Sequence, residues 1–175
     1  KIFFEISLSI AKAEATVPEC VYGILNPSSM SKKASAFFSK EEKIRIEKAI
    51  VQAEEFSSGE VRVHIDNKCG EEVLESASHV FAKLKMHQTK LRNGVLFYLE
   101  VKSRKFAILG DIGINQKVPK DFWDTIKEEM KDRFLKGDYV GGLEHGILKA
   151  GLKLKDHFPY QSEDINELSD EITFG

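Results

Sequence analysis

A strand–helix–strand pattern between residues 59 and 101 constrains the fold more than any other feature of this sequence. Apolar residues at 61, 63 and 65 alternate with polar ones, which is typical of a β-strand. A helical stripe of apolar residues follows over 71–86, and a second strand is predicted over 95–101. Two strands joined through a helix pair in parallel, with a right-handed crossover. The sequence therefore predicts a sheet with a parallel pair of strands.

Four predicted helices accompany this pair and a third strand. Ser39 and Glu42 form a capping box, which opens the first helix, and Pro119 suits the first position of the third helix. A short polar turn before the third strand indicates a hairpin. We expect an α/β fold, a three-layer α/β/α sandwich with a small mixed sheet, in the order α-β-α-β-β-α-α. The predicted helices are 39–56, 71–86, 119–136 and 140–157, and the predicted strands are 61–65, 95–101 and 105–109.

The charge balance and the cysteines limit the partners and the location. The chain of 175 residues carries 26 Lys and Arg against 28 Asp and Glu. This balance argues against nucleic acid, because phosphate binding needs a basic surplus. Cys20 and Cys69 have no metal-binding spacing; a disulfide is one alternative, and free thiols in a reducing compartment are favoured. No apolar run is long enough to span a bilayer. We expect a cytoplasmic monomer.

The sequence divides into three parts. Residues 1–29 have no apolar periodicity, and Met30 is typical of a natural start. We therefore expect 1–29 to be a non-native or disordered extension that adds little to the core; a remnant of an export signal is the alternative. Residues 30–160 form the predicted globular domain, and residues 161–175 form an acidic C-terminal tail.

Glycines and charged residues gather at one predicted edge of the sheet. Parallel strands begin at the same end, and the antiparallel third strand ends where the second begins. If the three strands are neighbours, three segments should therefore meet at this edge: Gly59-Glu60, Arg92-Asn93-Gly94 and Gly110-Asp111. This edge is the main lead to function.

The polar residues in question have both structural and functional interpretations. Asp111 is the best candidate ligand for a hard cation, which prefers carboxylate oxygens; an Asx-turn is the alternative. Glu60 and Arg62 share one strand face, and a buried Arg62 would pair with Glu60 or Asp111. Asp138 is either a ligand or the start of the last helix. The glycines are also explained by turns with positive φ.

Five segments follow one another along the chain: Phe38-Ser39-Lys40-Glu41-Glu42, Ser58-Gly59-Glu60-Val61-Arg62-Val63, Arg92-Asn93-Gly94-Val95-Leu96, Gly110-Asp111-Ile112-Gly113-Ile114, and Gly137-Asp138-Tyr139 with Gly142-Leu143 and Gly146-Ile147. Together they resemble the TPM domain family, also called the TPM phosphatase domain. The resemblance covers about residues 37–158 and extends to the compact cytosolic bacterial members, which end in an acidic segment like residues 166–171.

This resemblance implies an α/β/α fold and a cleft of acidic residues that binds divalent cations such as Ca²⁺. It also implies either acid phosphatase activity, as in plant members, or a non-catalytic role in the assembly or repair of membrane protein complexes. The candidate residues are Asp111, Glu60 and Asp138 for Ca²⁺ or Mg²⁺, Arg92 and Asn93 for a phosphate ester, and Asp111 and Arg62 for catalysis.

The sequence itself supports catalysis only weakly. It has no Cys-x5-Arg loop, no Asp-x-Asp pair and no Walker loop. Ser57 and Ser58 are the only evident nucleophiles, and neither has a His or Lys base nearby in sequence. Two hypotheses follow. The first is a divalent-cation-binding domain with at most slow phosphomonoester hydrolysis. The second is a non-catalytic interaction module that engages a protein partner through its tail and cleft.

Overall fold

The computed structural model describes residues 11–16, 33–67, 72–161 and 166–175, and it confirms the predicted α/β class. Short 3-10 helices, η4 (Ala34–Ala36) and η5 (Met86–Gln88), accompany the main elements. In chain order these are β1 (Ala11–Thr16), α1 (Lys40–Glu54), β2 (Glu60–Asp66), α2 (Val73–Lys83), β3 (Gly94–Glu100), β4 (Lys105–Gly110), α3 (Ile112–Asn115), α4 (Phe122–Phe134), α5 (Tyr139–His157) and β5 (Thr173–Phe174).

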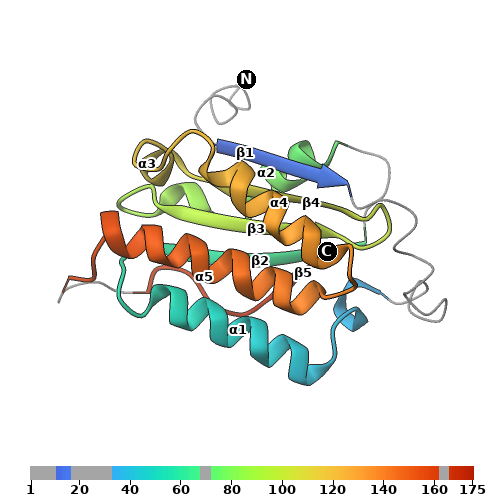
Figure 1. Cartoon of the computed structure of the whole chain (residues 1–175). Helices are drawn as coiled ribbons and strands as arrows, with labels where there is room; N and C mark the ends of the chain where they lie inside the picture. The colour runs from blue at the N-terminus through green and yellow to red at the C-terminus, as the bar shows by residue number, and fades with distance from the viewer. Residues whose placement is uncertain (1–10, 17–32, 68–71, 162–165) are drawn as a thin grey trace.

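The sheet has five strands in the order β1-β4-β3-β2-β5 (Figure 1). The predicted centre is confirmed: β2 and β3 are parallel, and β3 and β4 are antiparallel. Two strands were not expected. β1 pairs antiparallel with β4, and β5 pairs in parallel with β2, so segments from both terminal parts of the chain form the outer strands. The observed element order therefore has a strand at each end that the predicted order lacks.

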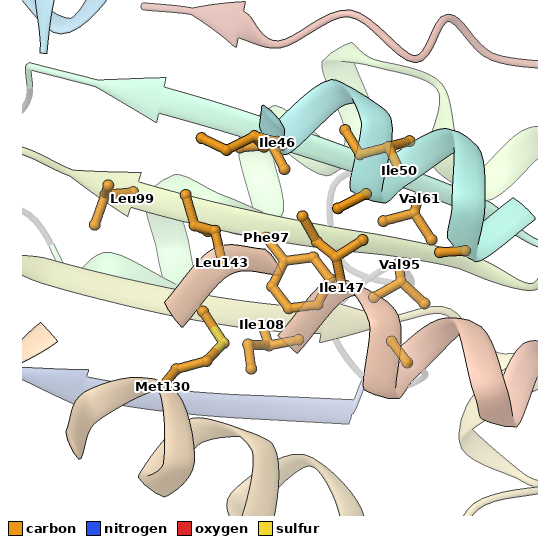
Figure 2. Packing of buried hydrophobic residues seen from close by; sticks show 14 of the residues in the cluster. Ile46, Ile50, Val61, Val95, Phe97, Leu99, Ile108, Met130, Leu143 and Ile147 are labelled. Atoms are coloured by element: carbon orange, nitrogen blue, oxygen red, sulfur yellow. The ribbon is translucent and has the colours of Figure 1, made fainter. Parts of the chain in front are cut away.

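Helices pack on both faces of this sheet. On one face, Val61 of β2 and Phe97 of β3 join a large apolar cluster with Ile50 of α1 and Ile147 of α5 (Figure 2). On the other face, Leu96 of β3 packs with residues of α2 such as Phe81. Adjacent β3 residues thus point to opposite faces, as strand geometry requires. Figure 1 shows α1, α4 and α5 in front of the sheet and α2 behind it.

Helices α1 and α5 run in the same direction on their shared face. Near their first turns, Arg45 and Glu144 form an ion pair of 2.7 Å. Just beyond their last turns, Ser57 and Pro159 form an isolated β-bridge. The capping box at the start of α1 is confirmed, since the Glu42 amide donates to Ser39 Oγ at 3.2 Å and the Ser39 amide donates to Glu42 Oε2 at 2.7 Å. β2 begins shortly after α1 ends, so its first residues lie beside the C-terminal ends of both helices.

The N-terminal segment differs from its prediction where the structure describes it. Residues 11–16 form β1, in a register that sets Ala13 opposite Ile108. Backbone pairing at a sheet edge needs no apolar stripe, which is why periodicity along 1–29 does not reveal it. Residues 1–10 and 17–32 lie outside the described residues, as do Cys20 and Cys69, so the predictions made for them stay predictions. Within the described ranges, no helix has the length and apolar character that crossing a membrane requires.

Pairing of β1 along β4 predicts that the N-terminal segment contributes to stability. Deleting residues 1–16 removes a six-residue strand and leaves β4 as an open edge, so we expect the Tm to fall by roughly 3 °C or more. Deleting only residues 1–10 is the matched control and should leave the Tm within about 1 °C. Differential scanning calorimetry on the three chains checks this. Equal Tm values for all three would show that β1 adds nothing, as the sequence alone suggests.

Candidate functional site

The predicted sheet edge exists at the backbone level. Glu60 lies opposite Gly94 in the parallel register of β2 and β3. The amide of Asp111 donates to the carbonyl of Gly94 at 2.9 Å. The starts of β2 and β3 and the end of β4 therefore meet, as the connectivity predicted. What their side chains do at this edge differs from the prediction.

Asp111 is committed to structural contacts. Its side chain is fully buried, and Arg92 binds it with two N–H groups: Nε donates to Oδ2 at 2.7 Å and Nη2 donates to Oδ1 at 2.9 Å. Oδ1 also accepts the amide of Ile112 at 2.8 Å, which caps α3. Hydrogen bonding to Asp111 raises the pKa of Arg92. Both carboxylate oxygens already have donors, so the geometry favours the structural interpretation of Asp111 over the cation ligand.

The two residues predicted to hold phosphate also have contacts of their own. Arg92 adopts the left-handed region at φ 53° and turns its guanidinium onto Asp111. Asn93 is fully buried, and its Nδ2 donates to the carbonyl of Ser58 at 2.8 Å. Asn93 therefore links β3 to the loop before β2. Arg92 is thus engaged by Asp111, whereas Asn93 is anchored through Nδ2 and its buried Oδ1 has no hydrogen-bond partner among the described residues.

The glycines at this edge are needed for space and not for positive φ. Gly137 is the one glycine with positive φ among the described residues. A Cβ at Gly113 would lie 2.2 Å from the carbonyl oxygen of Leu91, and one at Gly110 would lie 2.5 Å from the ring of Trp123. The turn interpretation of these glycines is therefore wrong: each lets backbone or an aromatic ring approach closely.

Asp138 does not join the edge. Its Oδ1 accepts the amide of Gly141 at 2.9 Å and caps α5, and Arg133 lies 3.4 Å from its Oδ2. The edge lies near the other end of α5, and a helix of 19 residues is about 28 Å long. The three predicted metal ligands, Asp111, Glu60 and Asp138, are therefore not brought together.

Arg62 is buried as expected, with 6% of its surface exposed, but its expected partner is absent. Asp111 pairs with Arg92 instead, and within the described part of the chain no hydrogen bond reaches Arg62 Nε. Burial lowers the pKa of Arg62, and the nearby charges of Glu54 and Asp170 act in the opposite direction. Arg62 is thus a buried cation beneath a group of carboxyl groups, without a close ion pair to any of them.

Those carboxyl groups surround a cavity of about 230 Å³ at the start of β2, here named the acidic cavity. Its walls come from the end of α1 and the loop after it, from β2, and from the C-terminal segment. The lining residues are Val51, Glu54, Glu55, Ser57, Ser58, Gly59, Glu60, Tyr160, Asn166 and Asp170. Of the predicted site residues, only Glu60 lies here.

Hydrogen bonds hold the walls of the acidic cavity in place. Glu60 accepts two amides of the C-terminal segment, those of Glu167 at 2.9 Å and Leu168 at 3.2 Å. Glu54 Oε1 accepts the amide of Val61 at 2.6 Å, and Asp170 lies close enough to raise the pKa of Glu54. Sequence reasoning missed Glu54 and Asp170, because one lies on a polar helix face and the other in an acidic tail, where carboxylates are ordinary.

Two carboxyl groups at the acidic cavity, those of Glu54 and Glu60, are protonated unusually easily. Burial raises the pKa of Glu54 to about 9, against the effect of the Val61 amide, and the charges of Glu60 and Asp170 raise it further. Burial likewise raises the pKa of Glu60 to about 7, although the amides of Glu167 and Leu168 oppose this. Burial is the main cause of both shifts, and the charges of neighbouring carboxyl groups add to it.

The donor set suits a hard cation, although the side chains are not arranged around one. Carboxyl oxygens of Glu54, Glu60 and Asp170 and the amide oxygen of Asn166 are the ligand types that Ca²⁺ and Mg²⁺ prefer. In the described ranges, no three His, Cys, Asp or Glu side chains are already positioned to hold a metal ion. The residues fit a cation in chemistry, and a bound ion would require their side chains to turn inward.

Comparisons with known proteins support the family resemblance that the sequence motifs indicate. A family model described as the TPM domain matches residues 31–152. The chain is also similar to a solved structure, the NMR structure of the BA42 protein from the psychrophilic bacterium Bizionia argentinensis, with 43% identity and a TM-score of 0.75. That similarity covers 82% of this chain and 99% of BA42. No curated protein matches the chain.

The raised pKa values predict how stability depends on pH. Glu60 binds its proton more tightly in the folded chain, at a pKa of about 7, than at its ordinary 4.5. The protonated Glu60 carboxyl group therefore stabilises the folded chain fully below pH 4.5, and this contribution is lost as the pH rises through 7. Glu54 adds a similar contribution, which is lost as the pH rises toward 9. We expect the free energy of unfolding to fall between pH 5 and 9 by on the order of 3 kcal/mol more in the parent than in Glu60→Gln. Urea titrations at several pH values measure this, and parallel profiles for the two chains would contradict it.

The contacts of Asp111 predict a structural cost for its removal. Asp111→Asn keeps the shape but leaves Arg92 without its counter-charge. We expect a loss on the order of 2 kcal/mol, below the roughly 3–5 kcal/mol of a fully buried pair because the Arg92 side chain is 44% exposed. Asp138→Asn is the matched control, since it also caps a helix but pairs at the surface, and should cost less than about 1 kcal/mol. Urea unfolding of both variants measures these losses. If Asp111→Asn kept the stability of the parent but lost cation binding, Asp111 would be a cation ligand after all.

Proposed function

The chain belongs to the TPM domain family, and on that premise we propose that it binds a divalent cation, Ca²⁺ or Mg²⁺, in the acidic cavity, with phosphomonoester hydrolysis at most slow. Glu60 remains from the ligand set expected from the sequence. Glu54 and Asp170 take the places of Asp111 and Asp138, which have other partners in the fold.

The proximity of Glu54 and Asp170, which line the acidic cavity from α1 and from the C-terminal segment, carries this proposal. Carboxylates this close repel one another when ionised, and a bound cation relieves that repulsion. Burial raises the pKa of Glu54 and Glu60, and neighbouring carboxyl charges raise it further, so a divalent cation that neutralises these charges competes with the bound protons. Near neutral pH a divalent cation can replace these protons.

The surrounding residues suggest how the cation would be held. Glu54, Glu60 and Asp170 supply carboxylate oxygens, Asn166 can supply an amide oxygen, and water completes the six to eight oxygens typical of Ca²⁺. Arg62 nearby opposes the cation electrostatically, which favours modest affinity. The two amides on Glu60 keep that carboxylate in place at the cavity wall.

Catalysis has little support around the acidic cavity. A bound cation would polarise a phosphate ester and activate water. The nearby hydroxyl groups are otherwise engaged: Ser57 Oγ accepts the amide of Gly59 at 3.3 Å, and Ser58 Oγ donates to the carbonyl of Phe158 at 3.4 Å. Asp111 and Arg62, the residues expected to be catalytic, have no role in this arrangement that requires a substrate. Slow hydrolysis by a cation-bound water is the most that we propose.

The second candidate function is a non-catalytic interaction module, and one observation favours it. Large apolar side chains are exposed on α1, on the loop after it and on α5: Val51 is 52% exposed, Phe56 53% and Leu152 63%. Phe56 and Leu152 also line a shallow cavity of about 290 Å³ together with Leu148. Exposed apolar groups that cluster in this way are typical of protein-binding surfaces.

Calorimetric titration of the full chain with CaCl₂ and with MgCl₂ tests the proposal. We expect saturable binding of at least one ion, and Asp170→Asn should weaken it at least tenfold, about 1.4 kcal/mol. Asp156→Asn is the matched control: it removes an equal charge from the surface of α5, where Asp156 pairs with Lys153, and should leave the affinity unchanged. Asp111→Asn should also bind normally if it folds.

Two outcomes would contradict the proposal. Equal weakening by Asp170→Asn and Asp156→Asn would show only general attraction of cations to the surface. Absence of binding, together with no hydrolysis of a generic phosphomonoester above buffer, would leave the interaction module as the better candidate.

A further inference from the structure

We infer that a cation in the acidic cavity locks the C-terminal segment 166–175, here named the C-terminal strap, onto the outer edge of β2, so that cation occupancy decides whether this edge is covered. The inference rests on the proposed function, because it assigns a consequence to cation binding at the same cavity. Its basis is the position of the strap, which forms one wall of the cavity and one strand of the sheet.

The strap is held on β2 by a small number of specific contacts. His64 and Ile65 lie opposite Thr173 and Phe174 in parallel register. The Thr173 hydroxyl donates to the carbonyl of Val63 at 3.3 Å and accepts from His64 Nδ1 at 2.8 Å. The amide of Gly175 donates to the carbonyl of Ile65 at 3.1 Å. These contacts place the strap as the last strand of the sheet.

The apolar contribution to docking is limited. Ile172 is buried with 6% exposure, whereas Phe174 remains 37% exposed. β5 has two residues, far fewer than the five or six of an average strand. Segments with few buried apolar contacts and short ladders open at low free-energy cost. The strap is therefore the part of the sheet whose attachment a ligand can most easily shift.

Docking of the strap crowds carboxyl groups together. The strap brings Glu167, Asp170 and Glu171 toward carboxyl groups that α1 and β2 already hold. The ionisable groups that face the strap are Glu47, Glu54 and Glu55 from α1, Glu60, Arg62, His64 and Asp66 from β2, and Lys43, whose Nζ lies 5.0 Å from the centre of the Phe174 ring. Carboxyl groups outnumber cationic ones in this set, so docking concentrates groups that a bound cation can neutralise.

The cavity has one wall on the body and one on the strap. Glu54 and Glu60 belong to α1 and β2, and Asn166 and Asp170 belong to the strap. An ion that uses ligands from both walls can bind fully only when the strap is docked. By linkage, the ion then stabilises docking, and docking raises the affinity for the ion by the same factor.

Release of the strap would have a defined structural result. The backbone groups of Val63 and Ile65 that now bind Thr173 and Gly175 would be exposed along an open strand edge. Such an edge pairs readily with an extended peptide. The same cation would therefore control access of an extended segment from a partner to the edge of β2.

Amide hydrogen exchange on the full chain, with and without CaCl₂ near one hundred times its Kd, tests the inference. Exchange of the amides of Leu168 and Gly175 should slow at least tenfold with Ca²⁺, up to about 100-fold if the ion binds only the docked strap. The amide of Ile108 in β4 should change much less, because it lies away from the strap. The same exchange measurement is repeated with MgCl₂ and with NaCl at equal ionic strength. Slowing by NaCl as well would indicate general screening of charge, whereas slowing by a divalent ion alone would indicate binding.

A variant outside the cavity tests the reciprocal effect. Thr173→Val removes the hydrogen bonds to His64 and Val63 but no cavity residue, and should weaken Ca²⁺ binding at least threefold. Thr125→Val in α4 is the matched control, with the same change far from the strap, and should bind Ca²⁺ like the parent.

The outcomes separate the two proposals. If Ca²⁺ binds but neither strap exchange nor the affinity of Thr173→Val changes, the locking inference is overturned while the proposed function stands. If Ca²⁺ and Mg²⁺ do not bind at all, both are overturned. Slowed exchange at Leu168 and Gly175 together with weaker binding by Thr173→Val supports the lock.

Discussion

The parallel register between β2 and β3 is the constraint on which the rest of the site depends. It sets Glu60 opposite Gly94, next to the amide of Asp111 from β4. Alternation along β2 then turns Val61 and Val63 into the core beneath α1 and α5, while Glu60 and Arg62 point to the opposite face. A slip of one residue would exchange these sets and bury charges against two helices. Burial of one face therefore dictates that charged groups collect on the other.

The carboxyl groups near this edge are stabilised in two different ways, and the difference separates structure from candidate function. Asp111 is neutralised by two N–H groups of Arg92 and an amide of α3, so nothing about it requires a ligand. Glu54 and Glu60 receive amide hydrogen bonds but form no close ion pair with the nearby Arg62, and burial raises the pKa of both. A buried carboxylate with a matched guanidinium supports the fold, whereas carboxyl groups crowded together without one favour a proton or a metal ion.

Much of the fold follows from local patterns. The capping box at Ser39, the alternation in β2 and the hairpin of β3 and β4 were all predicted, because each depends on neighbouring residues and backbone geometry. β1 and β5 were not, since a short outer strand is formed by backbone pairing with a distant segment and needs no apolar pattern. The site was predicted less well. Asp138 matched the expected chemistry, but it caps α5 at the end away from the sheet edge.

Periodicity and connectivity along the chain were enough to place β2, β3 and β4 side by side and to bring Glu60 and Asp111 to one edge. They were not enough to show which charges meet there. Arg92 reaches Asp111 because of a left-handed turn, and Glu54 meets Asp170 because the strap folds back from the far end of the chain. Ion pairing and crowding depend on distances of a few ångströms between segments remote in sequence, so only the packed structure decides them.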